Sequence, residues 1–370
     1  MLIYIILMVW LLVQIPLAAS INEKQTSLAI NNKRFSLSNA LLWFNCFALT
    51  VIAAFRSNAV GTDTHTYNFW FTQLDEYNLS KVVDWSETSN IEIGIGILAK
   101  IGKIVFNSNH GAWLVLNIVM FWALYQFIKT YSFNYAFSAF LFVCFGLYNQ
   151  SFNISGQFIA GGLLLVSLVS LKKDNIKQYF FFLMLAIIVH RSAVIGLIIF
   201  PMYKMKKSVV KISLLTVLTA FILSRFASQI IPYIVSRTIY SHYLHWEVSS
   251  ESGVGLIMNI LLFACFVCFY KDMQEVDNNA HVWVYAAALT VSLNFFISSL
   301  GMIARVMVYF KLFYLASIPC LSMAIKSRIK SKLLANFASL GIVILFAVYY
   351  LYSLTHSTCF DTVPYIFEWF

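Results

Sequence analysis

Apolar residues form long, nearly continuous runs along almost the whole chain, and short polar stretches separate these runs. Runs of this length can cross the hydrocarbon core of a bilayer as helices. The pattern predicts an all-α integral membrane protein, with about 10–12 transmembrane helices in a single polytopic domain, 1–370. The clearest predicted spans are 1–19, 39–55, 111–128, 135–149, 157–171, 208–224, 254–270, 281–299, 302–322 and 333–353.

Composition agrees with this class of protein. Hydrophobic residues make up 61% of the chain and charged residues 11%, whereas soluble domains usually carry about 25% charged residues. The net charge of +10 does not indicate a nucleic-acid partner, because the lysines and arginines are clustered between apolar runs, as in cytoplasmic loops. Segment 1–20 lacks a basic start and a clear cleavage site, so it is interpreted as a first span.

Basic and acidic residues are divided unevenly among the polar stretches. Four clusters contain 14 of the 25 lysine and arginine residues, and the positive-inside rule places all four in the cytoplasm. They are Lys24/Lys33/Arg34, Lys172/Lys173/Lys177, Lys204/Lys206/Lys207/Lys211 and Lys326/Arg328/Lys330/Lys332. Segment 56–92 carries six acidic residues against two basic ones and is expected to be the main extracytoplasmic loop, with 225–253 as a second.

Two apolar segments are ambiguous. Segment 178–203 has a basic cluster at each end and is interrupted by His190, Arg191 and Ser192, which favours a broken or re-entrant hairpin with His190 at its tip. Segment 93–106 is short and contains two lysines, so we expect it to dip in from the outside without crossing. In the alternative topology each segment crosses once, which would move the lysines of 172–177 to the outside.

In the favoured topology, the polar residues that spans usually avoid all fall toward the outer face. They are Arg56, Asp63, Glu92, Gln157, His190, Arg191, Arg225 and Arg305. An ionisable residue inside a membrane costs about 2.5–3.5 kcal/mol on insertion scales and is a functional candidate by default. Each also has a simpler interpretation: an arginine can be an interfacial anchor, a carboxylate a cap or turn residue, and a lone histidine a packed side chain. The seven histidines show no metal-ligand spacing, so no metal site is expected.

Several motifs occur in an order that resembles a known family. They are R-x3-VGTD-x3-Y from Arg56 to Tyr67, E-x-G at Glu92 and Gly94, GQFIAGG with Gln157, HRSA at His190–Ala193, Arg305 with Tyr309, and VPYIF with Pro364-Tyr365. Together they resemble the EpsG-like branch of the Wzy-type polysaccharide polymerases over nearly the whole chain. One departure is Gly156, where the family commonly has an arginine before the glutamine; Arg191 is an alternative source of that charge.

The resemblance implies a glycosyltransferase without a metal or other cofactor. Such enzymes join oligosaccharide repeats carried on undecaprenyl pyrophosphate, at the outer face of the bacterial inner (cytoplasmic) membrane, into O-antigen or a similar surface polysaccharide. Other expected partners are membrane lipid and a chain-length regulator protein, with no nucleic acid.

A sugar hydroxyl of the incoming repeat displaces the lipid diphosphate, which requires cations for the departing diphosphate and a base for the hydroxyl. We therefore expect His190 to be the general base, with Asp63 positioning it or the acceptor sugar, and with the reverse assignment as the weaker alternative. The expected substrate-binding residues are Arg56, Thr62, Tyr67, Glu92, Gln157, Arg191, Arg305 and Tyr309.

Other activities share parts of this pattern. A lipid-linked oligosaccharide flippase would also be polytopic and basic, but it favours internal repeats and polar groups along a central path. A membrane O-acyltransferase of surface glycans would pair its histidine with a cytoplasmic acyl-donor site. An O-antigen ligase is usually marked by a larger outer loop late in the chain than 225–253.

Overall fold

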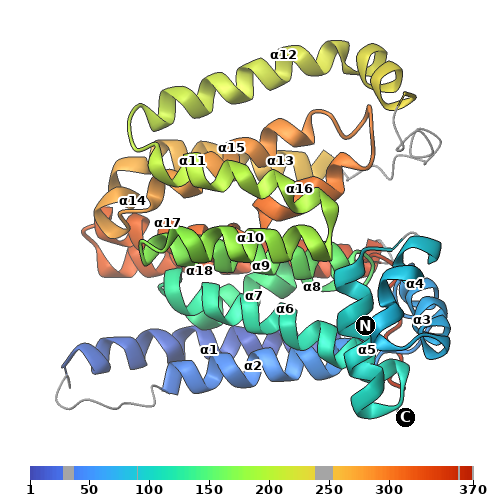
Figure 1. Ribbon diagram of the computed structural model, residues 1–370. Coiled ribbons are helices and arrows are strands. Elements are labelled where there is room, and N and C mark those ends of the chain that lie inside the picture. Colours follow the sequence, from blue (N-terminus) through green and yellow to red (C-terminus); the bar gives the residue numbers. More distant parts are fainter. Residues whose placement is uncertain (28–36, 90, 238–252, 357–358, 369–370) are drawn as a thin grey trace. The chain divides into compact units, whose positions relative to one another are not determined.

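The computed structural model describes residues 1–27, 37–89, 91–237, 253–356 and 359–368, and all its regular elements are helices (Figure 1). An isolated antiparallel bridge joins Arg56 to Phe367. The predicted all-α class is confirmed. The chain divides into two compact units: unit 1 comprises Met1–Val194 and Leu340–Phe370, and unit 2 comprises Ile195–Ser339.

The helices of unit 1 are α1 (Leu2–Ser27), α2 (Leu37–Ala54), α3 (Thr64–Gln73), η1 (Leu74–Glu76), η2 (Leu79–Lys81), α4 (Val82–Ser89), α5 (Ile93–Phe106), α6 (Asn109–Tyr131), α7 (Tyr135–Cys144), α8 (Leu147–Gln150), α9 (Ser155–Lys172) and α10 (Ile176–Val189). The helices of unit 2 are α11 (Ile199–Lys204), α12 (Val209–Val235), α13 (Gly253–Cys268), α14 (Tyr270–Val276), α15 (Ala280–Asn294), α16 (Ile303–Lys311) and α17 (Tyr314–Arg328). The unit boundary falls within η3 (Arg191–Ile198) and within α18 (Lys332–His356).

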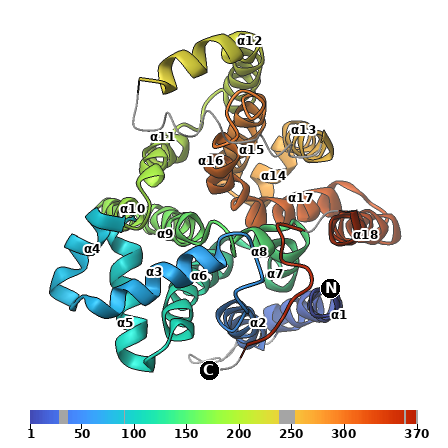
Figure 2. The ribbon, with the colours of Figure 1, turned by 90° about the vertical axis from the view of Figure 1, so that its right-hand side faces the viewer.

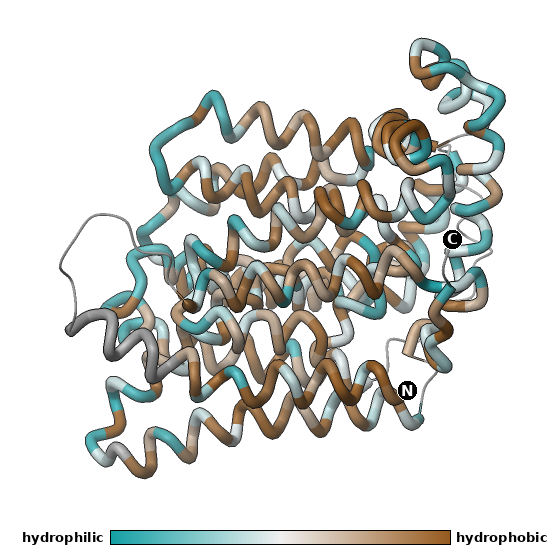
Figure 3. Tube along the Cα trace, turned by 90° about the horizontal axis from the view of Figure 1, so that it is seen from below, coloured by the Kyte–Doolittle hydropathy of each residue, from teal (hydrophilic) through white to brown (hydrophobic). Residues whose placement is uncertain are grey.

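Five described helices are long and apolar enough to cross a membrane, and the number rises to seven if two bent pairs each form one span. The five are Leu37–Ala54, Asn109–Tyr131, Ser155–Lys172, Val209–Val235 and Leu333–His356. The bent pairs are α13 with α14, at 72°, and α16 with α17, at 47°. Three shorter apolar helices, Leu2–Ala18, Tyr135–Cys144 and Ile176–Val189, lie in further predicted spans or hairpin arms. Figure 3 shows apolar residues along the helices and polar residues mostly at helix ends and connections.

Helix α9 is the core of unit 1. Protein buries 94% of its span, compared with 44% of the span of α2. It packs against α6 and α10, while α2 packs against α6 and α1 against α7. Because α9 has almost no outward face, residues at its N-terminus can meet side chains from the neighbouring helices.

The polar elements of unit 1 gather at one end of its helices. The C-terminal end of α2 meets the N-terminal end of α6, where the rings of Phe55 and His110 stack with centroids 5.6 Å apart. Figure 2 looks onto this end, with α9 and α10 nearly end-on and α3 in front of α6. A Cβ atom added to Gly102 of α5 would lie 2.2 Å from the carbonyl oxygen of Gly111 in α6, so these helices touch through their backbones. Lys100 and Lys103 hydrogen-bond to residues 71–75, so α5 is held at this end along its length; whether 93–106 crosses the membrane stays a prediction.

Two boundaries in the structure concern the expected loops. The helix is interrupted at His190, as predicted. Helix α10 ends at Val189, His190 is extended (φ −155°, ψ 118°), and the 3-10 helix η3 begins at Arg191. Helix α12, however, continues to Val235, so the start of the expected loop 225–253 is helical, because residues 226–235 remain mostly apolar. Residues 238–252 lie outside the described residues, as does most of the cluster Lys24/Lys33/Arg34.

Candidate functional site

His190 lies between a carboxylate and a hydroxyl group. Its Nε2 atom is 3.7 Å from Oε1 of Glu92, and the two side chains are 25% and 24% exposed. Its Nδ1 atom is 2.8 Å from Oγ of Ser192. The imidazole therefore has a hydrogen-bonded partner at Nδ1 and a carboxylate near Nε2, and it remains partly accessible.

A glycine brings Glu92 to this position. Glu92 is the N-cap residue of α5, and Gly94 follows in its first turn. A Cβ atom added to Gly94 would lie 2.7 Å from Cα of Val189 and 2.8 Å from the carbonyl oxygen of Ile188, closer than real Cβ atoms come. Because Gly94 has no side chain, the start of α5 rests directly on the end of α10, and Glu92 lies beside His190.

Tyr67 and Gly156 complete this group. The backbone N–H of Gly156, at the start of α9, donates a hydrogen bond to Oη of Tyr67 at 3.4 Å. A Cβ atom on Gly156 would be 3.4 Å from Cδ2 of His190, so the imidazole lies over the glycine backbone. The Tyr67 ring packs against Trp113, with centroids 5.2 Å apart. We call Tyr67, Glu92, Gly156, His190 and Ser192 the His190 cluster.

Arg56 is in a different environment, although it lies at the same end of unit 1. Its side chain is 1% exposed. Nε donates to Oγ1 of Thr64 at 2.9 Å, Nη2 donates to the carbonyl oxygen of Phe152 at 3.3 Å, and Nη1 donates to the carbonyl oxygen of Ala53. The guanidinium carbon lies 3.7 Å from the ring centroid of Trp113. We call these five residues the Arg56 knot.

The Arg56 side chain remains positively charged although it is buried. Burial lowers the pKa of Arg56 to about 10, so the guanidinium is still cationic at neutral pH. All three of its nitrogen atoms donate to atoms of the protein, and its face is covered by an aromatic ring. In this conformation Arg56 connects α2, α3, α6 and the turn at Phe152.

The C-terminal segment lies along the same polar stretch. Oη of Tyr365 donates to the carbonyl oxygen of Ile52 at 2.6 Å, and the N–H of Gly61 donates to the carbonyl oxygen of Asp361 at 2.8 Å. The N–H of Ser57 donates to the carbonyl oxygen of Ile366 at 3.0 Å. The C-terminal segment that contains the VPYIF motif is therefore hydrogen-bonded along the motif that begins at Arg56.

The remaining candidates of unit 1 are placed as follows. Thr62 is exposed and donates to Oδ1 of Asp63 at 3.0 Å, at the N-cap of α3. Gln157 is 4% exposed, and its Oε1 has no hydrogen-bond partner among the described residues. Arg191 is exposed directly after His190. The carboxylate found at His190 is that of Glu92, so a positioning role for Asp63 stays a prediction.

Sequence reasoning missed the role of the two lysines of α5. Nζ of Lys103 donates at 2.8 Å to the carbonyl oxygen of Phe71, to Oδ2 of Asp75 and to Oδ1 of Asn109. Nζ of Lys100 donates at 2.8 Å to the carbonyl oxygen of Leu74. Their spacing of three residues places both on one face of a helix, which was the available signal. They fasten α5 to the C-terminal end of α3.

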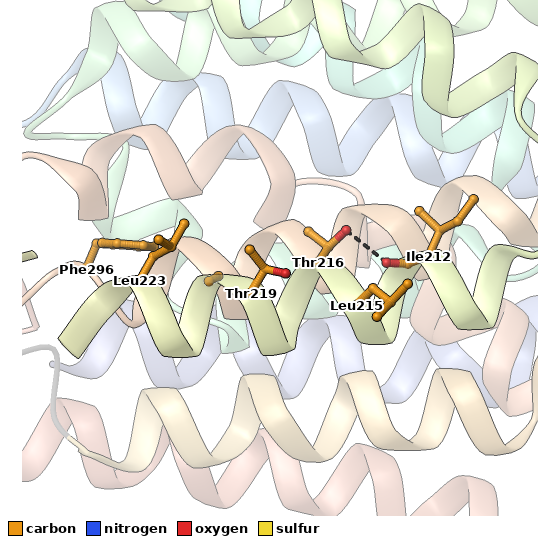
Figure 4. Close-up of a pocket in the computed structure, with 7 residues that line it drawn as sticks. Ile212, Leu215, Thr216, Thr219, Leu223 and Phe296 are labelled. Carbon is orange, nitrogen blue, oxygen red and sulfur yellow. Dashed lines mark hydrogen bonds between the residues drawn. The ribbon is translucent and has the colours of Figure 1, made fainter. Parts of the chain in front are cut away.

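Two expected binding residues belong to unit 2. Arg305 is half-buried on α16, and Tyr309 follows one turn later and is 2% exposed. A groove of about 480 Å³ in unit 2 runs along α12 (Figure 4). It is lined by Ile212, Leu215, Thr216, Thr219, Ala220, Leu223 and Phe296. These lining residues carry no ionisable group, so the groove is not a site of acid–base chemistry.

These features define a multi-pass, all-helical membrane protein with a carboxylate–imidazole group at one end of a helical unit. Within the described residues, no three His, Cys, Asp or Glu side chains gather as metal ligands would. The sequence model of the EpsG family matches residues 39–367. The chain belongs to the EpsG family, as its ordered motifs indicated. No curated protein and no solved structure matches the chain.

Proposed function

We propose that this protein is a glycosyltransferase that polymerises oligosaccharide repeats carried on undecaprenyl pyrophosphate into O-antigen or a similar surface polysaccharide. Membership of the EpsG family and the multi-pass helical architecture support this proposal. The charge pattern of the connections supports placing the polar end of unit 1 at the outer face of the bacterial inner membrane. A chain-length regulator protein is the proposed protein partner.

The observation that carries the proposal is the His190 cluster. In the proposed reaction, a sugar hydroxyl of one repeat attacks the anomeric carbon of another repeat, and the bond to the lipid diphosphate breaks. The hydroxyl proton must be removed, and Glu92 and His190 form a reachable acid–base pair with Nε2 and Oε1 3.7 Å apart. Because the donor repeat is already activated by its diphosphate, the reaction needs no nucleotide.

The departing diphosphate requires cations. Arg191 is exposed beside His190, so it can approach a ligand at the His190 cluster. Arg56 is buried and hydrogen-bonded to other residues of the protein. Arg305 remains a proposed diphosphate-binding residue, with Tyr309 one turn away on α16. Arginine suits this role because its planar fork contacts two phosphate oxygens at once.

Deletion of the gene tests the proposal directly. We expect the surface polysaccharide of the deletion strain to run on a gel as the lipid core with a single repeat, because repeats are still made, exported and transferred but not joined. Bare core would instead indicate a flippase or a ligase, and an intact ladder would indicate a modifying enzyme such as an acyltransferase. A plasmid-borne wild-type gene is the control and should restore the ladder.

A further inference from the structure

The His190 cluster contains two candidate bases, and the hydrogen bonds of the imidazole distinguish them. We infer that Glu92 takes the proton from the acceptor hydroxyl and that His190 is a positioning residue that orients the Glu92 carboxylate. This inference rests on the proposed function and deepens it by exchanging the expected roles of the two side chains.

The first step concerns the position of the imidazole proton. The backbone N–H of Ser192 donates to Nδ1 of His190 at 3.4 Å. A backbone N–H is always a donor, so Nδ1 must present its lone pair to it. The hydroxyl of Ser192, at 2.8 Å from the same atom, can donate in the same direction. The neutral imidazole then carries its proton on Nε2.

The local backbone gives a reason for this arrangement. His190 directly precedes η3, and its extended conformation resembles that of a helix N-cap residue. Its Nδ1 accepts from the N–H two residues later, as a capping oxygen would. Nδ1 therefore satisfies an amide of the first turn of η3, and a proton-accepting role at this atom would compete with that bond.

The second step concerns the group that faces the Nε2 proton. Oε1 of Glu92 lies 3.7 Å from Nε2, beyond hydrogen-bond distance but close enough that this carboxylate is the acceptor we assign to the Nε2 proton. A neutral imidazole that donates from Nε2 has no lone pair on that atom with which to remove a proton. The carboxylate accepts on both of its oxygens, so the second oxygen remains available to an incoming hydroxyl.

The position of Glu92 also suits a base. It is the N-cap residue of α5, so its side chain stands at the end of the helix, beside His190. Among the described residues, no hydrogen bond from the Glu92 side chain caps α5. At 24% exposure the carboxylate is accessible while part of its surface is shielded from water.

The proposed step balances as follows. The acceptor hydroxyl oxygen forms a bond to the anomeric carbon of the donor sugar as its proton moves to the Glu92 carboxylate. The bond between that carbon and the diphosphate oxygen breaks, and the lipid diphosphate leaves with the bonding electron pair. His190 keeps its Nε2 proton throughout and holds one carboxylate oxygen in place.

Two nearly isosteric variants test the assignment. The assay follows polymer formation by purified protein from lipid-linked repeats extracted from the deletion strain. We expect Glu92→Gln to lower kcat by about 10²–10⁴, the usual contribution of a general base, with little change in KM. His190→Gln can keep an N–H donor toward Glu92 but loses the acceptor for Ser192, so kcat should fall by about tenfold or less, as for one lost hydrogen bond.

Chemical rescue provides a readout that a purely structural role would not give. Formate should restore part of the activity of Glu92→Ala, because a small carboxylate can occupy the vacated space and accept the proton. Imidazole should not restore His190→Ala, because the base is still present in that variant. Protein level and thermal unfolding in detergent are measured for every variant.

The outcomes separate this inference from the proposed function. Near-normal turnover by Glu92→Gln, or a much larger loss in His190→Gln that imidazole reverses in His190→Ala, would show that His190 is the base and overturn the inference alone. Failure of the wild-type protein to join the extracted repeats would overturn the proposed function and this inference together.

Discussion

The Arg56 knot and the Glu92–His190 pair lie at the same end of unit 1, and both contain ionisable groups that an apolar chain would be expected to avoid. They differ in exposure and in how fully their hydrogen-bonding groups are used. Arg56 is 1% exposed and donates from all three guanidinium nitrogens. Glu92 and His190 are about a quarter exposed, with their nearest polar atoms 3.7 Å apart.

This difference separates a structural charge from a reactive one. A buried cation is tolerated when its donors are paired, and removing it leaves several acceptors unsatisfied. A catalytic group needs a route to substrate and a partner that leaves some of its hydrogen-bonding capacity unused. By the criterion of exposure, the Arg56 knot is structural, and the Glu92–His190 pair is the part that we propose to react.

The largest effect on stability is expected for Arg56→Ala. The substitution would leave Oγ1 of Thr64 and two carbonyl oxygens without their donor and would uncover the face of Trp113. We expect a loss of roughly 3–5 kcal/mol in the free energy of unfolding, as for truncating a large buried side chain, with the unsatisfied acceptors contributing to it. Thermal unfolding in detergent and the amount of protein in the membrane would measure it.

Arg56→Lys sharpens this test. A lysine keeps the positive charge but cannot reproduce the planar guanidinium that reaches three acceptors. The Arg56→Lys protein should therefore also be less stable than the wild type. A variant of Arg56 that is stable and abundant yet unable to bind lipid-linked repeats would contradict the structural role and restore Arg56 to the substrate-binding set.

The fold class could be predicted from the sequence because a membrane imposes one dominant rule, a long apolar run for each crossing helix. The breaks inside runs were harder to predict. The span predicted at 302–322 bends by 47° between α16 and α17, at Leu312 and Phe313, where neither glycine nor proline marks the break. His190 was recognisable as a break because three polar residues interrupt its run.

Sequence reasoning named Glu92 and His190 as candidates but could not predict that they lie side by side. Glu92 and His190 are nearly a hundred residues apart, and their meeting depends on Gly94 approaching the backbone of Val189. Asp63 was the expected partner because it was predicted to lie at the same outer face as His190. Sequence alone also could not show that Arg56 is buried. An arginine that follows a span can be an interfacial anchor, a substrate-binding residue or a buried structural residue, and the sequence does not distinguish these roles.

Gly94→Ala tests how the Glu92–His190 pair is built. The added methyl group would collide with the backbone of α10, so α5 must shift and carry Glu92 away from His190. Overpacking of this kind costs about 1–3 kcal/mol, and we expect kcat to fall more than the protein level does. Gly341→Ala is the matched control, because a Cβ atom there meets nothing within 4 Å in helix α18. Unchanged activity in Gly94→Ala would mean that the pair does not depend on this close approach.

The smallest effect is expected for Arg225→Ala, the exposed counterpart of Arg56→Ala. The guanidinium carbon of Arg225 also lies over an aromatic ring, 4.5 Å from the centroid of Phe221, but its side chain is exposed on α12. An exposed cation–π contact is worth about 0.5–1 kcal/mol. Unfolding in detergent and polymer formation should both stay close to wild type. A loss as large as that of Arg56→Ala would show that aromatic contact, rather than burial with paired donors, makes an arginine structural in this protein.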